Sequence, residues 1–208
     1  MNKAVIFDMD GTLQDSSGVI VGAINSVRQK LGLSPMNIED ILKGINNPNI
    51  NPAKYFYETN SFLPKHQEWF SSYYNDNYAI GIRLYEGIKE LLIWLKNSGC
   101  YLAVATNGYR SSAKSSLEYL GIYEYFDTIV SYDDVANGKP APDMLFEILD
   151  RLNITNKQAI FVGDSELDRL AAQNANIEFI YVSWGYSDTN GVGTISQLKR
   201  LLKSWCNI

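Results

Sequence analysis

The chain has 208 residues, 46% of them hydrophobic and 20% charged, which is typical of a globular protein with one core, or one domain carrying a smaller insertion. Its net charge of -5 disfavours a nucleic-acid partner, because phosphate backbones attract basic surfaces. No apolar stretch reaches membrane-spanning length, and an apolar segment begins at Ala4, too early for a removable signal peptide. We therefore expect a cytoplasmic protein with no membrane partner.

The first predicted element is a short strand. Ala4 to Phe7 is a continuous apolar run, as expected of a strand buried on both faces. Asp8 and Asp10 follow directly, and because the pleat relaxes at the turn that Gly11 begins, both carboxylates can line one pocket. One carboxylate can attack phosphorus while the other moves protons, and their crowded charge favours a magnesium ion. The pair indicates phosphoryl-transfer chemistry, although an isolated Asp-Gly also fits a simple turn.

The next part of the chain is predicted to be helical. Apolar residues recur at helical spacing from Ile20 to Leu31, and the helix should end at Gly32. From about Ser16 to Ile80 no buried strand is indicated, and nine aromatic residues between Tyr55 and Tyr78 are expected to pack a helical core. We interpret this stretch as an all-helical insertion.

From Leu84 onward, helices and strands alternate. The patterns predict helices over 87–97, 111–120, 142–152, 167–174 and 195–205, and strands over 101–105, 128–131, 159–162 and 179–182. Such alternation predicts an α/β fold, a doubly wound parallel sheet with helices on both faces. Functional sites in such sheets lie beyond the carboxyl ends of the strands.

Polar residues follow several of these strands and should meet at one edge of the sheet. Thr106 offers a hydroxyl, and the backbone amides of Asn107 and the following glycine can bind anionic oxygen. Lys139 is a point charge suited to a phosphoryl group, and Asp164 with Asp168 can present carboxylates to a hard cation. Each residue alone also fits a helix cap or a solvated surface position. Their joint order favours a single site.

In this order the residues resemble the four motifs of the haloacid dehalogenase superfamily. The motifs read Asp8-Met9-Asp10-Gly11-Thr12-Leu13, Thr106-Asn107-Gly108, Gly138-Lys139-Pro140-Ala141-Pro142-Asp143 and Gly163-Asp164-Ser165-Glu166-Leu167-Asp168. The stretch from Leu84 to Ile88 and the position of the insertion are similar to phosphoglycolate phosphatases with a helical cap. The resemblance implies a Rossmann-like core over residues 1–14 and 82–208 and a helical cap domain over residues 15–81.

The resemblance also implies a role for each motif residue. Asp8 would be the nucleophile, and Asp10 the general acid and base, whose backbone carbonyl also binds Mg²⁺. Thr106 and the Asn107 amide would hold phosphoryl oxygens, and Lys139 would neutralise charge during catalysis.

Two acids complete the set that the resemblance implies. Asp164 would join Asp8 and Asp10 as a metal ligand, and Asp168 would orient the site or bind the ion through water. Dehalogenase members lack the second acid, so Asp10 favours a phosphatase.

The implied function is magnesium-dependent hydrolysis of a small phosphomonoester, such as phosphoglycolate or a sugar phosphate, by a monomer or weak homodimer. A phosphomutase or phosphotransferase is the alternative, although the first cap helix lacks the histidine typical of mutases. A non-catalytic phosphate-binding module is a third reading, but receiver-type domains lack the insertion and the second acid. For specificity in the cap, Lys43 and Asn46 are candidates, because their segment resembles a loop that such caps place at the active site.

A few other residues bear on the chemistry. Gln14 stands where relatives commonly have an apolar residue, so we expect a polar group at the pocket entrance. His66 lies in a polar stretch and is interpreted as a solvated helix residue. Cys100 and Cys206 are far apart in sequence without a metal-type spacing, which predicts buried, reduced thiols.

Overall fold

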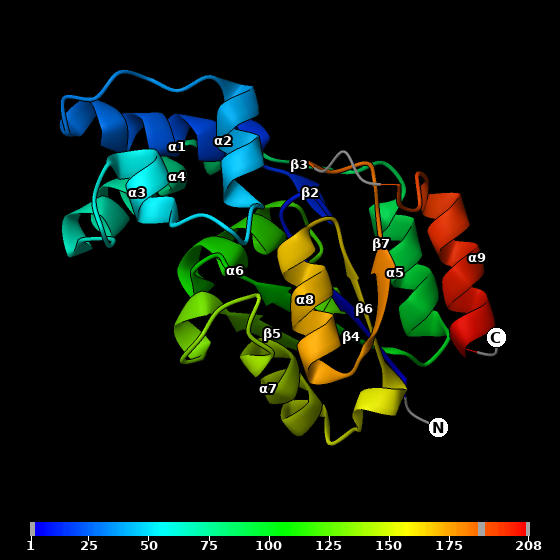
Figure 1. The fold of residues 1–208 in the computed structure, drawn as a ribbon. Helices are drawn as coiled ribbons and strands as arrows, with labels where there is room; N and C mark the ends of the chain where they lie inside the picture. Colours follow the sequence, from blue (N-terminus) through cyan, green and yellow to red (C-terminus); the bar gives the residue numbers. More distant parts are fainter. Residues whose placement is uncertain (1–2, 187–189, 207–208) are drawn as a thin grey trace. The chain divides into compact units, whose positions relative to one another are not determined.

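The computed structural model describes residues 3–186 and 190–206 and divides into two compact units (Figure 1). One unit is formed by Met1–Asp15 with Arg83–Ile208, and the other by Ser16–Ile82. The interpretation of these units as a catalytic core and a specificity cap stays a prediction. No helix within the described part of the chain is both long and apolar enough to cross a membrane.

The first unit is built on a parallel sheet. Among the described residues it has five strands in the order β5-β4-β1-β6-β7. Their bounds are β1 Ala4–Phe7, β4 Tyr101–Thr106, β5 Thr128–Ser131, β6 Ala159–Gly163 and β7 Glu178–Tyr181. β1 lies in the centre, with Phe7 level with Val104 of β4 on one side and Val162 of β6 on the other. The residues that follow these three strands therefore emerge side by side.

Helices cover both faces of this sheet (Figure 1). Their bounds are α5 Ile88–Asn97, α6 Arg110–Tyr119, α7 Asp143–Leu152, α8 Glu166–Ala175 and α9 Ile195–Cys206. Val5 and Phe7 point into the core formed with α5, α6 and α9, whereas Ile6 points into the core formed with α7 and α8. Because successive strand residues face opposite sides, a strand buried on both faces must be apolar throughout. The predicted α/β fold with a doubly wound sheet is confirmed.

The main differences from prediction in this unit are small elements. A two-stranded antiparallel ribbon pairs β2 Gln14–Asp15 with β3 Arg83–Leu84. Short 3-10 helices occupy 123–125, 132–134 and 156–158. Pro142 is the N-cap of α7 rather than its first residue. Elements of two or three residues are too short to show a periodic pattern, so the sequence does not reveal them.

The second unit is helical. It contains α1 Ser17–Lys30, α2 Ile38–Ile45, α3 Pro52–Tyr57 and α4 Pro64–Gly81. Ile24 and Val27 of α1 pack with Ile41 of α2 and Phe56 of α3 in one core. The buried Arg28 guanidinium donates to the backbone oxygen of Phe56 at 2.5 Å and to that of Ser34 at 2.7 Å, which ties α1 to the segments after it.

Two expectations for this stretch are corrected. His66 is buried, because its Nδ1 accepts from the backbone N–H of Leu63 at the start of α4 and its ring packs edge-on against Tyr57 at 5.1 Å. Burial lowers the pKa of His66. Not every aromatic residue joins the core, since Tyr55 and Phe62 are exposed.

Candidate active site

The candidate site lies where three neighbouring strands end. Asp8 follows β1, Thr106 is the last residue of β4, and Asp164 follows β6. All three are buried, and the backbone N–H of Asp8 still pairs with the backbone oxygen of Val162 at 2.9 Å. The regular sheet therefore fixes the backbone directly beneath the polar side chains.

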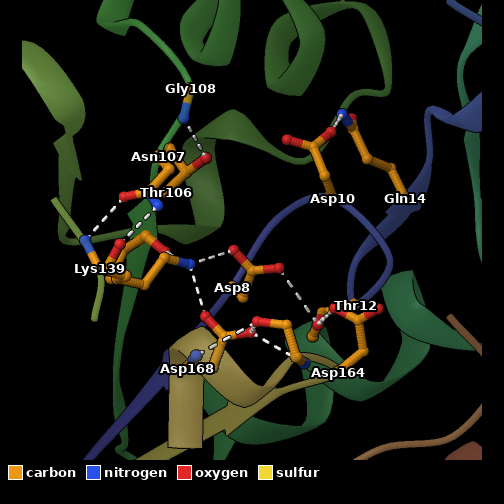
Figure 2. Close-up of polar contacts among 12 residues, drawn as sticks. Asp8, Asp10, Thr12, Gln14, Thr106, Asn107, Gly108, Lys139, Asp164 and Asp168 are labelled. Atoms are coloured by element: carbon orange, nitrogen blue, oxygen red, sulfur yellow. Dashed lines mark hydrogen bonds and ion pairs between the residues drawn. The ribbon is translucent and has the colours of Figure 1, made fainter. Parts of the chain in front are cut away.

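Lys139 is the centre of the polar contacts (Figure 2). Its Nζ donates to Asp8 Oδ1 at 2.5 Å, to Asp168 Oδ1 at 2.6 Å and to the backbone oxygen of Ala105 at 2.9 Å. Burial alone would lower the pKa of Lys139, but the charges of Asp168 and Asp8 and their hydrogen bonds raise it overall. The lysine is therefore a permanent positive charge beside Asp8.

Lys139 is one positive charge beside a cluster of three carboxylates. Ligand atoms of Asp8, Asp164 and Asp168 all lie within 4.8 Å of one another. Burial, followed by the charge of Asp168, raises the pKa of Asp8 well above its ordinary value, although Lys139 opposes the shift. The same two causes raise the pKa of Asp164 to about 7. Three buried carboxylates with one ammonium leave excess negative charge, which a bound divalent cation would relieve.

Asp168 has both carboxylate oxygens engaged within this cluster. Its Oδ1 accepts from Lys139, and its Oδ2 accepts from the Ser165 hydroxyl at 2.5 Å and from the Ser165 backbone N–H at 3.1 Å. These contacts belong to the N-terminal capping box of α8. This arrangement favours a role for Asp168 in orienting Lys139 and Ser165 over direct binding of a metal ion.

The Asp10 carboxylate has a hydrogen-bond partner on the turn that follows β1. The carboxylate turns away from Asp8 and towards Gln14, whose Nε2 donates to Asp10 Oδ1 at 2.8 Å (Figure 2). Gln14 is fully buried, so the expectation of a polar group at a pocket entrance is corrected. The compact turn from Met9 causes this, because the Gly11 N–H pairs with the Gln14 oxygen at 2.8 Å and brings the two side chains together.

Thr106 and Asn107 shape the side of the site near Lys139. Thr106 Oγ1 accepts from the backbone N–H of Gly108 at 2.9 Å, and a hydroxyl that accepts can still donate its own proton. The Asn107 side chain accepts from the backbone N–H of Lys139 at 2.8 Å and donates to its backbone oxygen at 3.0 Å. Asn107 therefore fixes the loop that carries Lys139.

Sequence reasoning missed the segment after β7. The backbone N–H of Tyr186 donates to Asp164 Oδ2 at 2.9 Å, and the Trp184 indole donates to the backbone oxygen of Thr12 at 3.1 Å. A Cβ on Gly185 would lie 2.1 Å from the Gly11 oxygen, so only glycine fits this approach. The only sequence signal was a glycine beside aromatic residues, which has no specific pattern.

Two candidate residues lie in the helical unit. Lys43 is exposed in the last turn of α2, and Asn46 is the C-cap of that helix. The expected loop around them is therefore helical as far as Ile45. Asn46 Nδ2 is a buried atom with no hydrogen-bond partner among the described residues. The structure brings together the candidate residues of the first unit. The role of Lys43 and Asn46 in substrate specificity stays a prediction.

Comparisons with known proteins agree with this fold. Residues 5–182 match the family model of the haloacid dehalogenase-like hydrolases. A phosphoglycolate phosphatase of Rhodobacter capsulatus is 30% identical over 196 residues, covering 91% of this chain and 88% of the relative. The pyrophosphatase PpaX of Bacillus velezensis is 33% identical over 184 residues, covering 87% of this chain and 83% of the relative.

A solved structure extends the likeness to three dimensions. The crystal structure of a candidate phosphoglycolate phosphatase from Lactobacillus plantarum superposes with a TM-score of 0.85 at 25% identity, covering 97% of this chain and 99% of the other. The chain belongs to the haloacid dehalogenase-like hydrolases. Within that family, the prediction of a phosphoric monoester hydrolase is confirmed as its enzyme class.

Proposed function

We propose that this chain is a magnesium-dependent phosphatase that hydrolyses a small phosphomonoester through a phosphoaspartate on Asp8. The observation that carries the proposal is the buried ion pair between Asp8 and Lys139 at 2.5 Å, with Asp164 in the same carboxylate cluster. An aspartate held beside a fixed positive charge can attack a phosphate whose own negative charge would otherwise repel it.

The residues present fit a divalent cation. Asp8 and Asp164 would hold it, with the backbone oxygen of Asp10 as a further ligand and Asp168 acting through Lys139 and Ser165. The raised pKa values of Asp8 and Asp164 support this, because burial with like charges and too little counter-charge is what a cation would correct. When bound, a magnesium ion supplies charge neutralisation for the transferring phosphoryl group.

The proposed reaction has two displacements at phosphorus. Asp8 attacks the phosphomonoester in line, and Asp10 donates a proton to the departing alcohol oxygen. Asp10 then removes a proton from water, which attacks the phosphoaspartate and releases inorganic phosphate. The contact with Gln14 supports the proposed role of Asp10 in proton transfer, because the Gln14 amide holds one oxygen of Asp10 and limits the rotation of the carboxylate.

The phosphoryl oxygens would be held on the Thr106 side of the site. The hydroxyl of Thr106, the backbone amide of Asn107 and the ammonium of Lys139 come from two segments that the Asn107 side chain ties together. Preorganised donors of this kind stabilise the charge that develops in the transition state.

A small phosphorylated metabolite is the substrate class that we propose. The relatives described above are named as a phosphoglycolate phosphatase and a pyrophosphatase, and both names describe compact phosphorylated molecules. Residues 15–80 carry five basic and six acidic side chains, a balance that gives no support to a highly anionic substrate. Lys43 and Asn46 stay the proposed specificity residues in that stretch.

The test is phosphate release from a panel of metabolite phosphates and an aryl phosphate, with Mg²⁺ or with a chelator. Asp8→Asn should lose at least roughly 10³-fold in kcat, whereas Asp150→Asn, an exposed aspartate of α7, should match the wild type. No release by the wild type from any panel member with Mg²⁺, or an active Asp8→Asn, would refute the proposal. Transfer of the phosphoryl group to a second alcohol would support the phosphotransferase alternative instead.

A further inference from the structure

The only two cysteines of the chain lie together, although 106 positions separate them in sequence. Their Sγ atoms are 3.3 Å apart, within hydrogen-bonding distance. Cys100 is buried immediately before β4, and Cys206 is the half-buried last residue of α9. Both cysteines are free thiols, and the expected burial holds for Cys100, whereas Cys206 is only half-buried.

We propose that Cys100 and Cys206 form an oxidation site, at which a small hydroperoxide converts the two thiols into an intramolecular disulfide. The sulfur atoms need to approach by only about 1.2 Å to reach bonding distance. α9 is already held against the core by the buried Leu198 and Leu202, so the thiols are kept close without the bond.

The surroundings of the pair favour its reaction. The hydrogen bond with Cys206 lowers the pKa of Cys100 to about 7, burial opposes the shift, and the Lys3 ammonium adds to it. Lys3 is fixed near the pair, because its Nζ lies 4.5 Å from the centre of the Trp205 ring and donates to the Trp205 backbone oxygen. A substantial thiolate fraction at neutral pH is what makes a cysteine an effective nucleophile.

The chemistry balances with hydrogen peroxide as the oxidant. The Cys100 thiolate attacks one peroxide oxygen, the O–O bond breaks, and a sulfenic acid forms with release of one water after protonation. The Cys206 thiol then attacks the sulfenic sulfur, the S–S bond forms, and a second water leaves. Both thiols are oxidised and the peroxide is reduced to two waters.

The consequence should be a more stable fold. Cys100 precedes β4, whereas the candidate active site lies at the opposite end of that strand, where Thr106 is the last residue. Six strand residues separate the two places by roughly 20 Å. The bond would join residues 106 positions apart and fasten the last helix to the sheet, and closing so long a loop restricts the unfolded chain strongly.

The test needs no knowledge of the substrate and so stands apart from the proposed function. Reduced wild-type protein and Cys206→Ser are treated with hydrogen peroxide, and intact mass, non-reducing peptide maps and melting temperature are recorded. The wild type should lose about 2 Da, yield one cross-linked peptide pair containing Cys100 and Cys206, and melt roughly 10 °C higher, all reversed by dithiothreitol. Cys206→Ser should show none of these changes.

Cys100→Ala is a second control, because it removes the nucleophile and should likewise fail to cross-link. Four results for the wild type would each overturn the inference. They are a mass gain from added oxygen without a cross-link, a disulfide-linked dimer, an unchanged mass, and a cross-link with an unchanged melting temperature.

Discussion

Replacing Lys139 by methionine tests whether the lysine is the buried counter-charge of the site. The change keeps an unbranched side chain that is one atom shorter, and it removes three hydrogen bonds, to Asp8, to Asp168 and to the Ala105 oxygen. Water cannot replace the ammonium, because the side chains of Lys139 and Asp168 are only 4% and 1% exposed. Removing one partner of such a pair costs about 3–5 kcal/mol, so Lys139→Met should lose that much unfolding free energy at about pH 8.

The loss should shrink at about pH 5, because the carboxylates left behind can then bind protons at a smaller cost. Urea denaturation in a chelating buffer measures both values. Lys96→Met is the matched control, since Lys96 also pairs with an aspartate, Asp127, at 2.8 Å but is 33% exposed. That variant should lose at most about 1 kcal/mol. A Lys139→Met variant as stable as Lys96→Met at both pH values would refute the reasoning.

Three further predictions concern Asp164 and Gln14. Mg²⁺ should raise the melting temperature of the wild type and of Asp150→Asn but not of Asp164→Asn, and an equal shift in all three would contradict Asp164 as a ligand. Without metal, the pKa of Asp164 near 7 lies above its unfolded value, so its ionisation destabilises the fold as pH rises from about 4 to 7. Asp164→Asn should therefore gain stability relative to the wild type by up to about 1.4 kcal/mol per pH unit in chelator, and a constant difference in urea denaturation would contradict this. Gln14→Leu should lower kcat about tenfold or more on an alkyl phosphate but little on an aryl phosphate, whose departing oxygen needs no proton. Equal losses on both substrates would show that Gln14 does not assist Asp10 as the general acid.

Much of the core could be predicted because its signals are local. β1, β4 and β6 are buried on both faces, so each appears in the sequence as an unbroken apolar run. Topology then places the carboxyl ends of these strands at one edge of the sheet, which is how Asp8, Thr106 and Asp164 could be grouped before their distances were known.

What could not be predicted depends on long-range packing. The contact of Tyr186 with Asp164 and that of Cys100 with Cys206 arise when the chain returns to a distant segment, and neither has a spacing rule. The burial of His66 could not be predicted, because its sequence neighbours are polar and the ring that covers it belongs to Tyr57, nine positions earlier. The direction of Asp10 follows from the turn and from Gln14, and a spacing of two residues does not specify a rotamer.

The most direct test of the central claim is whether the phosphoryl group becomes attached to Asp8. With an aryl phosphate, Asp10→Asn should still allow the first displacement, because the departing group needs no proton, but should slow attack by water. Acid quenching should then reveal a burst of about one equivalent of aryl alcohol and a mass increase of about 80 Da on the peptide that contains Asp8. Release of the aryl alcohol by Asp10→Asn with no phosphoryl group on Asp8 would contradict the account.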